Sequence, residues 1–302
     1  MRPKTFNEFF GKVNLKNQLQ TYIQSCAVKK ETLPHILFHG PSGVGKTSLA
    51  MIVANELNTK LRILQAPNLQ KISDLLNVFS LINKNDVLFI DEIHALSHQM
   101  MEFIFPVMED FSLDILIGKE FNTKITRMKI PKFTLVGATT QFGKVLGPME
   151  ERFGIVINVD YYTNDEIKLI IQKQMEKLNL NLTNQDLNLV ASHARMTPRL
   201  AIRLINRVND YKTIDNSLSL NEILKRLNIY ENGLVEQDIK YLVALKKCKS
   251  AGIKSLSIIT GIDPITIETK IEPFLLKLDL IEKTHRGRAI TNKGLNFVKN
   301  CI

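Results

Sequence analysis

The sequence is poor in cysteine and has no long hydrophobic segment. Only 3 of its 302 residues are cysteines, Cys26, Cys248 and Cys301. An odd number of scattered cysteines, without the spacing of metal ligands, excludes a disulfide scaffold and indicates reduced thiols that serve packing. No apolar run approaches the roughly 18 residues that a membrane span needs, and no charged and then apolar leader opens the chain. We therefore expect a cytoplasmic protein that does not cross a membrane.

The remaining composition is that of a globular protein with excess positive charge. Hydrophobic residues make up 44% of the chain and charged residues 23%, and the length allows two or three domains. The formal net charge is +10, and residues 240–302 carry 12 basic and 5 acidic side chains. Such a basic segment is a candidate surface for a polyanion, above all nucleic acid. A general lysine bias that serves solubility is the alternative, and charge alone does not decide between the two.

The most informative stretch is a glycine-rich loop between an expected strand and an expected helix. Residues 36–38 are apolar, as in a buried strand, and residues 48–57 continue with helical periodicity. The motif G-x-x-x-x-G-K-T lies between them, and its glycines let backbone N–H groups converge on phosphate oxygens. Lys46 is expected to contact the β- and γ-phosphates, and the Thr47 hydroxyl to ligate Mg²⁺. The sequence therefore predicts a site for a nucleoside triphosphate.

A second expected strand ends in two carboxylates. Residues 87–90 are all apolar, which is typical of a strand buried on both faces of a parallel sheet. Asp91 and Glu92 follow at the edge where open α/β sheets bind ligands. Asp91 is expected to hold Mg²⁺, and Glu92 to orient and deprotonate the attacking water. Two acidic residues at a strand end are a weak signal alone, but the signal becomes strong downstream of the glycine loop.

Four other side chains are candidates for the same chemistry. Thr140 and Thr139 follow the apolar residues 133–138, and a hydroxyl there is placed to hydrogen-bond the γ-phosphate or the water. Arg152 comes just after an expected helix, at an edge from which it is well placed to reach the nucleotide of a neighbouring subunit. Arg199 lies in the first turn of a helix that opens with proline, where it is expected to face a ligand.

Residues 110–132 predict an apolar β-hairpin inserted ahead of a core strand. Leu113, Ile115 and Ile117 are apolar at every second position, a turn is expected at residues 118–123, and apolar character then returns. An apolar hairpin that projects from a domain is a candidate docking element. Packing of the hairpin against its own domain is an equally good interpretation from the sequence alone.

The pattern along the chain predicts three domains. An α/β domain with a parallel sheet is expected over residues 1–160, since the signal changes from strands to helices at Tyr161 and Tyr162. A small helical domain is expected over residues 161–228, from amphipathic segments at 164–178, 185–194 and 198–208. A third domain is expected over residues 229–302.

The third domain has the order of a winged helix. Helices are expected over residues 238–248, 256–260 and 265–278, and a hairpin with a basic tip follows them. Lys283, Arg286 and Arg288 on this hairpin are expected to contact DNA phosphates. A winged helix that binds protein is the alternative, but the Arg-Gly-Arg tip and the basic charge of this region argue against it.

Taken in order, these motifs resemble one family, RuvB, the AAA+ ATPase motors of Holliday-junction branch migration. The resemblance runs from Arg2 to the last residues. It rests on the segments RPKTFNEFFG, GPSGVGKTSLA, DVLFIDEIHALS, VMEDFSLDILIG, FTLVGATT, ERFGIV, TPRLAIRL and HRGRAIT. The ATPase motifs alone are generic, whereas their combination with MEDFSLDILIG and the RGR hairpin is specific.

The resemblance implies a role for each matching residue. The implied nucleotide contacts are Arg2 and Tyr162 at the adenine, Gly43, Gly45, Lys46, Thr47 and Ser48 at the phosphates, and the segment Glu109, Asp110 and Phe111. Asp91 and Glu92 would form the Walker B pair, with Thr140 as sensor 1. Arg152 would act in trans as an arginine finger, and Arg199 as sensor 2 in cis.

The resemblance also implies an assembly and partners. We expect a homo-hexameric ring around duplex DNA that uses ATP and Mg²⁺. The hairpin at residues 112–130 would dock on RuvA, and the resolvase RuvC is a further possible partner. Hydrolysis should be weak without neighbours, because Arg152 would complete the site of another subunit.

The sequence departs from the family pattern at several positions. Met196 stands in place of a glycine, His285 in place of a proline and Lys283 in place of an arginine. The chain also starts almost at Arg2, without the leader of most relatives. We expect the start of the chain to affect the outer wall of the adenine site, and Met196 to affect the entry of Arg199 into the site. His285 and Lys283 are expected to affect the rigidity and the phosphate contacts of the wing.

Two other functions stay open. A clamp loader or a replication initiator would share the ATPase motifs, although clamp loaders usually lack the C-terminal wing and initiators lack the MEDF hairpin. A DNA-binding regulator that binds ATP without hydrolysing it is the second alternative. Intact Lys46, Asp91, Glu92 and Arg152 argue against that regulator.

Overall fold

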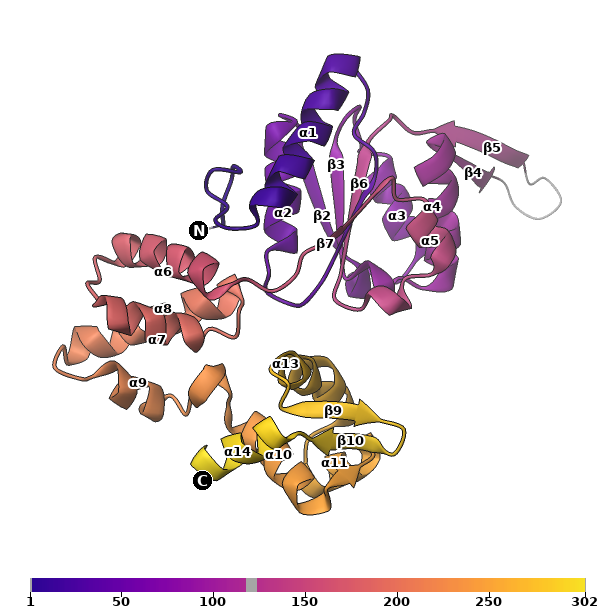
Figure 1. Ribbon diagram of the computed structural model, residues 1–302. Coiled ribbons are helices and arrows are strands. Elements are labelled where there is room, and N and C mark those ends of the chain that lie inside the picture. Colours follow the sequence, from indigo (N-terminus) through magenta and orange to yellow (C-terminus); the bar gives the residue numbers. More distant parts are fainter. Residues whose placement is uncertain (1, 118–123, 302) are drawn as a thin grey trace. The chain divides into compact units, whose positions relative to one another are not determined.

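The computed structural model describes residues 2–117 and 124–301, and it divides into two compact units (Figure 1). The first unit consists of Met1–Leu169 with Thr197–Arg199, and the second of Ile170–Met196 with Leu200–Ile302. The domain boundaries expected near residues 160 and 228 lie inside these units, so they stay predictions.

The first unit is built on a five-stranded parallel sheet with the order β2-β3-β6-β1-β7. Its strands are β1 (Ile36–His39), β2 (Leu61–Gln65), β3 (Val87–Asp91), β6 (Thr134–Thr139) and β7 (Ile155–Asn158). Each neighbouring pair runs parallel. The central strand β6 is buried at every residue, because helices cover both faces of the sheet, and this explains why the residues between its two terminal threonines are apolar or glycine.

Five helices cover this sheet. They are α1 (Val13–Lys29), α2 (Lys46–Glu56), α3 (Ile72–Phe79), α4 (His98–Asp110) and α5 (Gly147–Glu151). Helices α1 and α2 lie on one side, and α3, α4 and α5 lie on the other (Figure 1). The second side forms a large apolar core, in which Leu75, Ile104 and Met149 of the three helices pack with Leu88 and Leu135 of the strands. This core fixes the carboxyl ends of the strands, where the predicted site lies.

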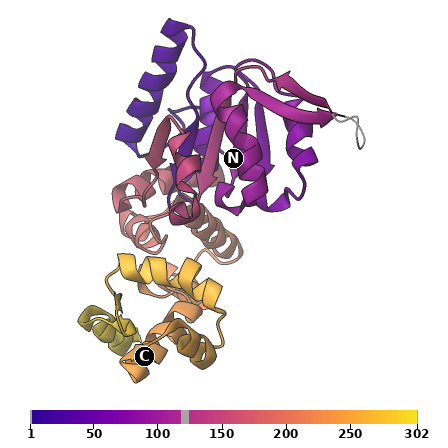
Figure 2. The ribbon, with the colours of Figure 1, turned by 90° about the vertical axis from the view of Figure 1, so that its right-hand side faces the viewer.

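The predicted hairpin is confirmed as β4 (Ser112–Ile117) paired antiparallel with β5 (Lys124–Lys129). It projects from the first unit (Figures 1 and 2), and the turn expected at residues 118–123 lies outside the described residues. Leu113 is buried in the core of its own domain, whereas Ile125 is 72% exposed. The base of the hairpin therefore packs against its own domain, whereas Ile125 further along the hairpin exposes an apolar side chain.

The helical part of the chain between the sheet and the C-terminal domain contains four helices. They are α6 (Asn164–Leu178), α7 (Asn184–Ser192), α8 (Pro198–Ile214) and α9 (Leu220–Arg226). Helix α6 has the predicted bounds, and α8 is longer than predicted. Thr183 and Ser219 accept hydrogen bonds from the first turns of α7 and α9, which explains where these helices begin.

The C-terminal part is a winged helix, as predicted. Its elements are α10 (Glu236–Cys248), β8 (Ser250–Ala251), α11 (Ile253–Thr260), α12 (Pro264–Thr266), α13 (Glu272–Lys277), β9 (Ile281–Thr284), β10 (Gly287–Ile290) and α14 (Asn292–Cys301). The strands form a sheet of order β8-β10-β9, in which β9 and β10 are the wing. The single helix expected over residues 265–278 is interrupted by a π-helical turn at Ile267–Ile271.

Candidate functional site

The glycine-rich loop adopts backbone conformations that favour glycine. Gly40, Gly43 and Gly45 have φ angles of 142°, 83° and 105°. At Gly40 the backbone also passes so close to β7 that an added Cβ would lie 2.2 Å from the carbonyl oxygen of Val159. Helix α2 begins directly after this loop at Lys46. The loop therefore brings backbone N–H groups and a helix N-terminus to one place, which is the geometry that binds phosphate.

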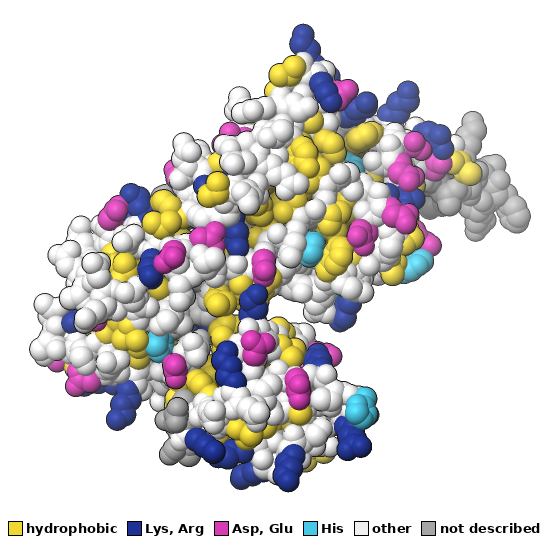
Figure 3. Space-filling model, in the orientation of Figure 1, with side chains coloured by type: hydrophobic (Ala, Val, Ile, Leu, Met, Phe, Trp, Pro, Cys, Tyr) yellow, Lys and Arg dark blue, Asp and Glu magenta, His cyan; other side chains and the backbone are white. Residues whose placement is uncertain are grey.

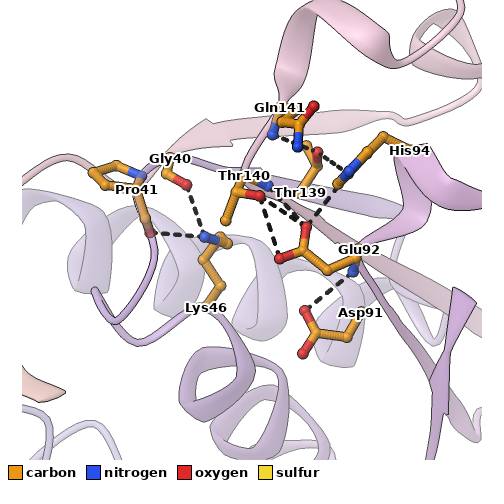
Figure 4. A network of polar contacts seen from close by, with 9 residues as sticks. All are labelled: Gly40, Pro41, Lys46, Asp91, Glu92, His94, Thr139, Thr140 and Gln141. Carbon is orange, nitrogen blue, oxygen red and sulfur yellow. Dashed lines mark hydrogen bonds and ion pairs between the residues drawn. The ribbon is translucent and has the colours of Figure 1, made fainter. Parts of the chain in front are cut away.

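Lys46 is buried at the start of α2 with its ammonium group in the loop. It donates hydrogen bonds to the carbonyl oxygens of Gly40 and Pro41, both at 2.8 Å (Figure 4). Burial lowers the pKa of Lys46 to about 8, although the carboxylates of Glu92 and Asp91 act in the opposite direction. An anionic ligand would favour the charged form of this side chain.

Glu92 lies at the end of β3 and is held by the neighbouring strand. Its carboxylate accepts hydrogen bonds from the Thr140 amide at 3.2 Å and from the Thr140 hydroxyl at 3.0 Å (Figure 4). The Nδ1 atom of His94 lies 3.3 Å from the same carboxylate and 2.9 Å from the Thr139 hydroxyl. The structure thus brings Glu92 and Thr140, which were predicted separately, into direct contact. It adds His94, which we did not predict.

Asp91 is half-buried beside Glu92. Burial raises the pKa of the Asp91 carboxyl, and the like charge of Glu92 raises it further. The backbone N–H of Glu92 donates to one carboxylate oxygen at 3.1 Å. Among the described residues no other hydrogen bond reaches this carboxylate, so its second oxygen faces no donor that competes with a cation.

Arg199 reaches the glycine loop from the short segment Thr197–Arg199, which belongs to the first unit. Its guanidinium lies 3.3 Å from the Ser42 hydroxyl, and its backbone N–H donates to the Gly43 carbonyl at 3.3 Å. An added Cβ on Gly43 would lie 3.1 Å from the Cβ of Arg199. The predicted proximity of Arg199 to the loop is therefore present.

The remaining residues predicted around the loop lie at its back and along α2. Tyr162 is buried, and its hydroxyl donates to the Val44 carbonyl at 3.1 Å, while Lys12 lies 4.6 Å from the centre of its ring. Burial raises the pKa of the Tyr162 hydroxyl. Arg2 is exposed and lies against Met51 of α2, with 3.9 Å between its Nη1 and the sulfur. Thr47 and Ser48 are half-buried in the first turn of α2.

Arg152 lies in a separate cluster with residues of α4 and α5. Its guanidinium pairs with Glu109 at 3.0 Å, donates to the Pro148 carbonyl at 2.6 Å and lies 4.3 Å from the centre of the Phe105 ring. These contacts hold the guanidinium in a defined orientation, and the Glu109 side chain is 54% exposed. The cluster is therefore accessible from outside the domain.

The two clusters lie at opposite ends of the parallel strands, one beyond their C-terminal ends and the other before their N-terminal ends. The glycine loop follows the C-terminal end of β1, whereas Arg152 comes just before the N-terminal end of β7, and these strands run parallel. Glu109 and Phe111 lie at this second end too, because His35, which precedes β1, contacts the Met108 carbonyl at 3.1 Å and the Phe111 ring. Phe111 packs against the core, and Asp110 is exposed at the end of α4. The predicted nucleotide residues thus form two groups that a single sheet keeps apart.

The predicted DNA contacts lie on the wing, but they differ in orientation. Glu272, fully buried at the start of α13, accepts hydrogen bonds from Arg288 at 2.7 Å and from the Tyr241 hydroxyl at 2.9 Å, and pairs with Lys283 at 3.2 Å. Burial alone would raise the pKa of Glu272, but these donors outweigh it and hold the pKa below its ordinary value. Arg286 at the tip is exposed. Among the described residues no carboxylate pairs with Arg286.

The fold and the loop geometry define a class of protein. A parallel sheet with a glycine loop after β1, two carboxylates after β3 and an arginine-bearing helical lid is the arrangement of an AAA+ P-loop ATPase. Three family models match consecutive parts of this chain: the Holliday junction DNA helicase RuvB P-loop domain over residues 1–159, the RuvB AAA lid domain over 162–231 and the RuvB C-terminal winged helix domain over 231–299. The chain belongs to the RuvB family.

Individual relatives agree with this assignment. The Holliday junction branch migration complex subunit RuvB of Mycoplasma pneumoniae is 47% identical over 300 residues, which cover 99% of this chain and 98% of that protein. The same subunit of Mycoplasma genitalium is 48% identical over 299 residues, or 99% of this chain and 97% of that protein. A solved structure, the Thermotoga maritima RuvB Holliday junction branch migration motor, superposes with a TM-score of 0.87 at 34% identity and covers 99% of this chain and 98% of that one.

Proposed function

We propose that this chain is the ATP-driven motor subunit that moves Holliday-junction DNA in recombination and repair, in a ring and together with RuvA. The observation that carries the proposal is the division of the nucleotide residues between the two ends of the parallel strands of one sheet. One end carries the loop with Lys46, and the other presents Arg152 to the outside. A chain of this kind is incomplete alone and complete next to a copy of itself. Neither a clamp loader nor a regulator without turnover is favoured by the family of the chain.

In cis, the glycine loop binds the triphosphate and the ends of β3 and β6 act on the water. Lys46 leaves the Gly40 and Pro41 carbonyls to contact the β- and γ-phosphates, while the N–H groups of Gly43, Gly45 and the first turn of α2, with Thr47 and Ser48, surround them. Glu92 orients the water and accepts its proton. Thr140, which holds Glu92, is placed to sense whether a γ-phosphate is present. Arg199 contacts the phosphates from the lid, and Arg2 and Tyr162 border the adenine.

Thr47 and Asp91 fit a magnesium ion. A hydroxyl and a carboxylate are the hard oxygen ligands that Mg²⁺ prefers. Asp91 has a raised pKa and a carboxylate oxygen with no described donor, so a cation beside it would favour its charged form. When bound, the ion neutralises charge on the β- and γ-phosphate oxygens.

In trans, Arg152 acts on the triphosphate of the adjacent protomer. The guanidinium is already oriented by Phe105, Glu109 and Pro148, so little side-chain entropy remains to be lost when it meets a γ-phosphate. Glu109, Asp110 and Phe111 lie at the same end and would border the neighbour's nucleotide. A closed ring, which we propose to be a homo-hexamer, gives every loop such a neighbour.

Partners are proposed for the two projecting elements. The hairpin of β4 and β5 offers the exposed Ile125 side chain to RuvA, and the wing offers Arg286 to DNA. RuvC is proposed to act on the same junction. No helix in the described part of the chain is long and apolar enough to cross a membrane, and we propose that the protein works in the cytoplasm.

The function is tested by the ATPase rate with and without four-way junction DNA and RuvA. We expect junction DNA and RuvA together to increase the rate and to allow the junction to be unwound. Ile125→Asp should remove the effect of RuvA while keeping the basal rate, because the substitution lies on the hairpin and away from both clusters. Thr126→Asp on the adjacent exposed position is the matched control. A rate that responds to neither DNA nor RuvA would contradict the motor function.

The wing is tested by two arginine substitutions two positions apart. Arg286→Met should reduce the salt slope of DNA affinity by about one, because one phosphate contact is lost. Arg288→Met should mainly destabilise the winged helix, by roughly 1.5–3 kcal/mol, since it removes a charge-assisted hydrogen bond from the buried Glu272, which keeps Lys283 and Tyr241. Binding titrations over a range of salt concentrations and thermal unfolding measure the two effects. A lower slope without any loss of stability in Arg288→Met would refute the structural role of the pair with Glu272.

A further inference from the structure

The turn between α7 and α8 has an unusual backbone. Arg195 and Met196 are consecutive non-glycine residues with positive φ angles of 48° and 55°. Residues with a Cβ seldom occupy this left-handed region. The two residues belong to the second unit, whereas Thr197–Arg199 belong to the first. The chain therefore passes from one unit to the other directly after a turn with a strongly restricted conformation.

The side chain of Arg195 is tied to the winged helix. Its Nη1 donates to Asp238 at 2.9 Å, and its guanidinium lies 4.3 Å from the centre of the Phe274 ring. Asp238 is 1% exposed and Phe274 is 4% exposed, so both contacts are shielded from water. A charge-assisted hydrogen bond and a cation–π contact in such surroundings hold the guanidinium firmly.

The two partners lie in two helices of the winged helix, α10 and α13. Asp238 is in the first turn of α10 and also accepts a hydrogen bond from the Val235 amide at 2.9 Å, which fixes the start of that helix. Phe274 is in α13, two residues after Glu272, and Glu272 holds Arg288 of the wing. A shift of Arg195 would therefore act on α10, on α13 and, through Glu272, on the wing.

The backbone beside Arg195 is closely packed as well. Gly233, in the connection that leads into α10, has a φ of 75°. An added Cβ there would lie 2.3 Å from the His193 carbonyl oxygen and 2.9 Å from the Cγ of Arg195. The connection and the end of α7 are thus in direct contact, which leaves little space for the turn to move without the winged helix.

Arg199, four residues after Arg195, contacts the glycine loop. Its guanidinium lies 3.3 Å from the Ser42 hydroxyl and its backbone N–H donates to Gly43 at 3.3 Å. A change in the loop on nucleotide binding would thus displace Arg199. Met196, between the two arginines, has a positive φ of 55°, and its side chain limits the conformations through which the turn could absorb this displacement.

We propose that Arg195 is a positioning residue that transmits the state of the nucleotide loop, contacted by Arg199, to α10 and α13 of the winged helix. The proposal rests on the proposed function, because it assigns to one turn the coupling between nucleotide and DNA that a motor requires. Arg195 is not among the residues that we propose to bind nucleotide or DNA. Its effect is on the response of one domain to the ligand of the other.

The test uses full-length variants. Arg195→Met with Asp238→Asn removes both charges, so that neither remains buried without a partner, and the asparagine keeps an acceptor for the Val235 amide. Arg195→Lys keeps the charge but lacks the planar group over Phe274. Arg207→Met is the matched control, since Arg207 forms an exposed ion pair with Asp210 on α8 at 3.1 Å. Nucleotide affinity, basal ATPase, DNA-stimulated ATPase, thermal stability and hydrogen exchange of α10 and α13 are measured for each.

In the wild type, ATPγS should change the hydrogen exchange of α10 and α13 even without DNA. The double variant should keep nucleotide affinity and basal ATPase within about twofold, lose about fivefold or more of the DNA stimulation, and show no exchange response to nucleotide. Arg195→Lys should lie between the two, and Arg207→Met should behave as wild type. A merely structural role would lower thermal stability without removing the exchange response.

Two outcomes would overturn the proposal. One is a wild type in which nucleotide leaves the exchange of α10 and α13 unchanged, and the other is a double variant that retains the full exchange response. If DNA does not stimulate the wild-type ATPase but the exchange response is present and depends on Arg195, the motor function fails while the coupling stands. The two failures are thus distinguishable.

Discussion

Replacing Arg152 with alanine is expected to leave nucleotide binding intact and to abolish almost all ATP turnover. The guanidinium lies before β7, at the end of the parallel strands opposite the loop with Lys46, so it cannot contribute to binding in its own protomer. Glu109 and the Phe105 ring orient it, and we propose that it acts on the nucleotide of a neighbour. An arginine finger is worth roughly 10³–10⁵ in rate in related NTPases. Nucleotide titration and steady-state ATPase measurements at a protein concentration that supports assembly will check this.

Complementation between inactive variants provides the control. Lys46→Ala should abolish nucleotide binding but leave Arg152 in place, so mixing it with Arg152→Ala should restore part of the activity through protomer pairs that combine an intact loop with an intact finger. Arg127→Ala, which removes an exposed arginine paired with Asp114 on the hairpin, should have little effect on turnover. Normal hydrolysis by Arg152→Ala alone would show that the site is not shared between protomers.

Glu92→Gln is expected to bind ATP and to hydrolyse it at least about 10²-fold more slowly, because it removes the carboxylate that we propose as the base for the attacking water. Glutamine keeps an oxygen that accepts the hydrogen bonds from the Thr140 amide and hydroxyl, so the local geometry should be retained. The substitution therefore separates proton transfer from positioning. Single-turnover hydrolysis and the amount of ATP retained after gel filtration are the measurements.

The matched control is the same substitution at a glutamate outside the site. Glu102→Gln changes an exposed carboxylate on α4 that pairs with His98, and it should hydrolyse ATP as the wild type does. Magnesium removal should slow both the wild type and Glu102→Gln. Equal rates for Glu92→Gln and the wild type would mean that another group activates the water.

The sequence alone predicted those parts of the fold that have a strong local signal. The continuous apolar runs of β1, β3 and β6 occur because both faces of the sheet are covered, and the bounds of α6 follow from its amphipathic period. Five elements were not predicted: β2, α4, α9, β8 and α14. Strand β2 is at a sheet edge and only half-buried, and Arg62 interrupts its apolar residues, so it lacks a long apolar run. Helix α4 contains Pro106, and a proline in the middle of a segment normally argues against a helix there.

The candidate site was predictable where chemistry is encoded by adjacent residues. Lys46, Asp91 and Glu92 belong to short motifs with a known strand context, and the structure places them together. The His94 contact was missed, although His94 follows Glu92 by two positions, because a histidine after a strand gives no signal of its direction. The orientation of Arg288 was not predictable either. Its partner Glu272 lies 16 positions earlier, and the π-helical turn before Glu272 changes which way that carboxylate faces.

Two of the three basic side chains of the wing are paired with Glu272, and we expect this pairing to shorten the time that a protomer stays on DNA. Paired cations release few counterions when they approach a phosphate, so they add little to the affinity. A single protomer is therefore expected to detach from the duplex readily. Rapid detachment suits a machine that must release one backbone position before it takes the next. Processive movement would then depend on how many protomers surround the duplex, and not on the strength with which any one of them holds it.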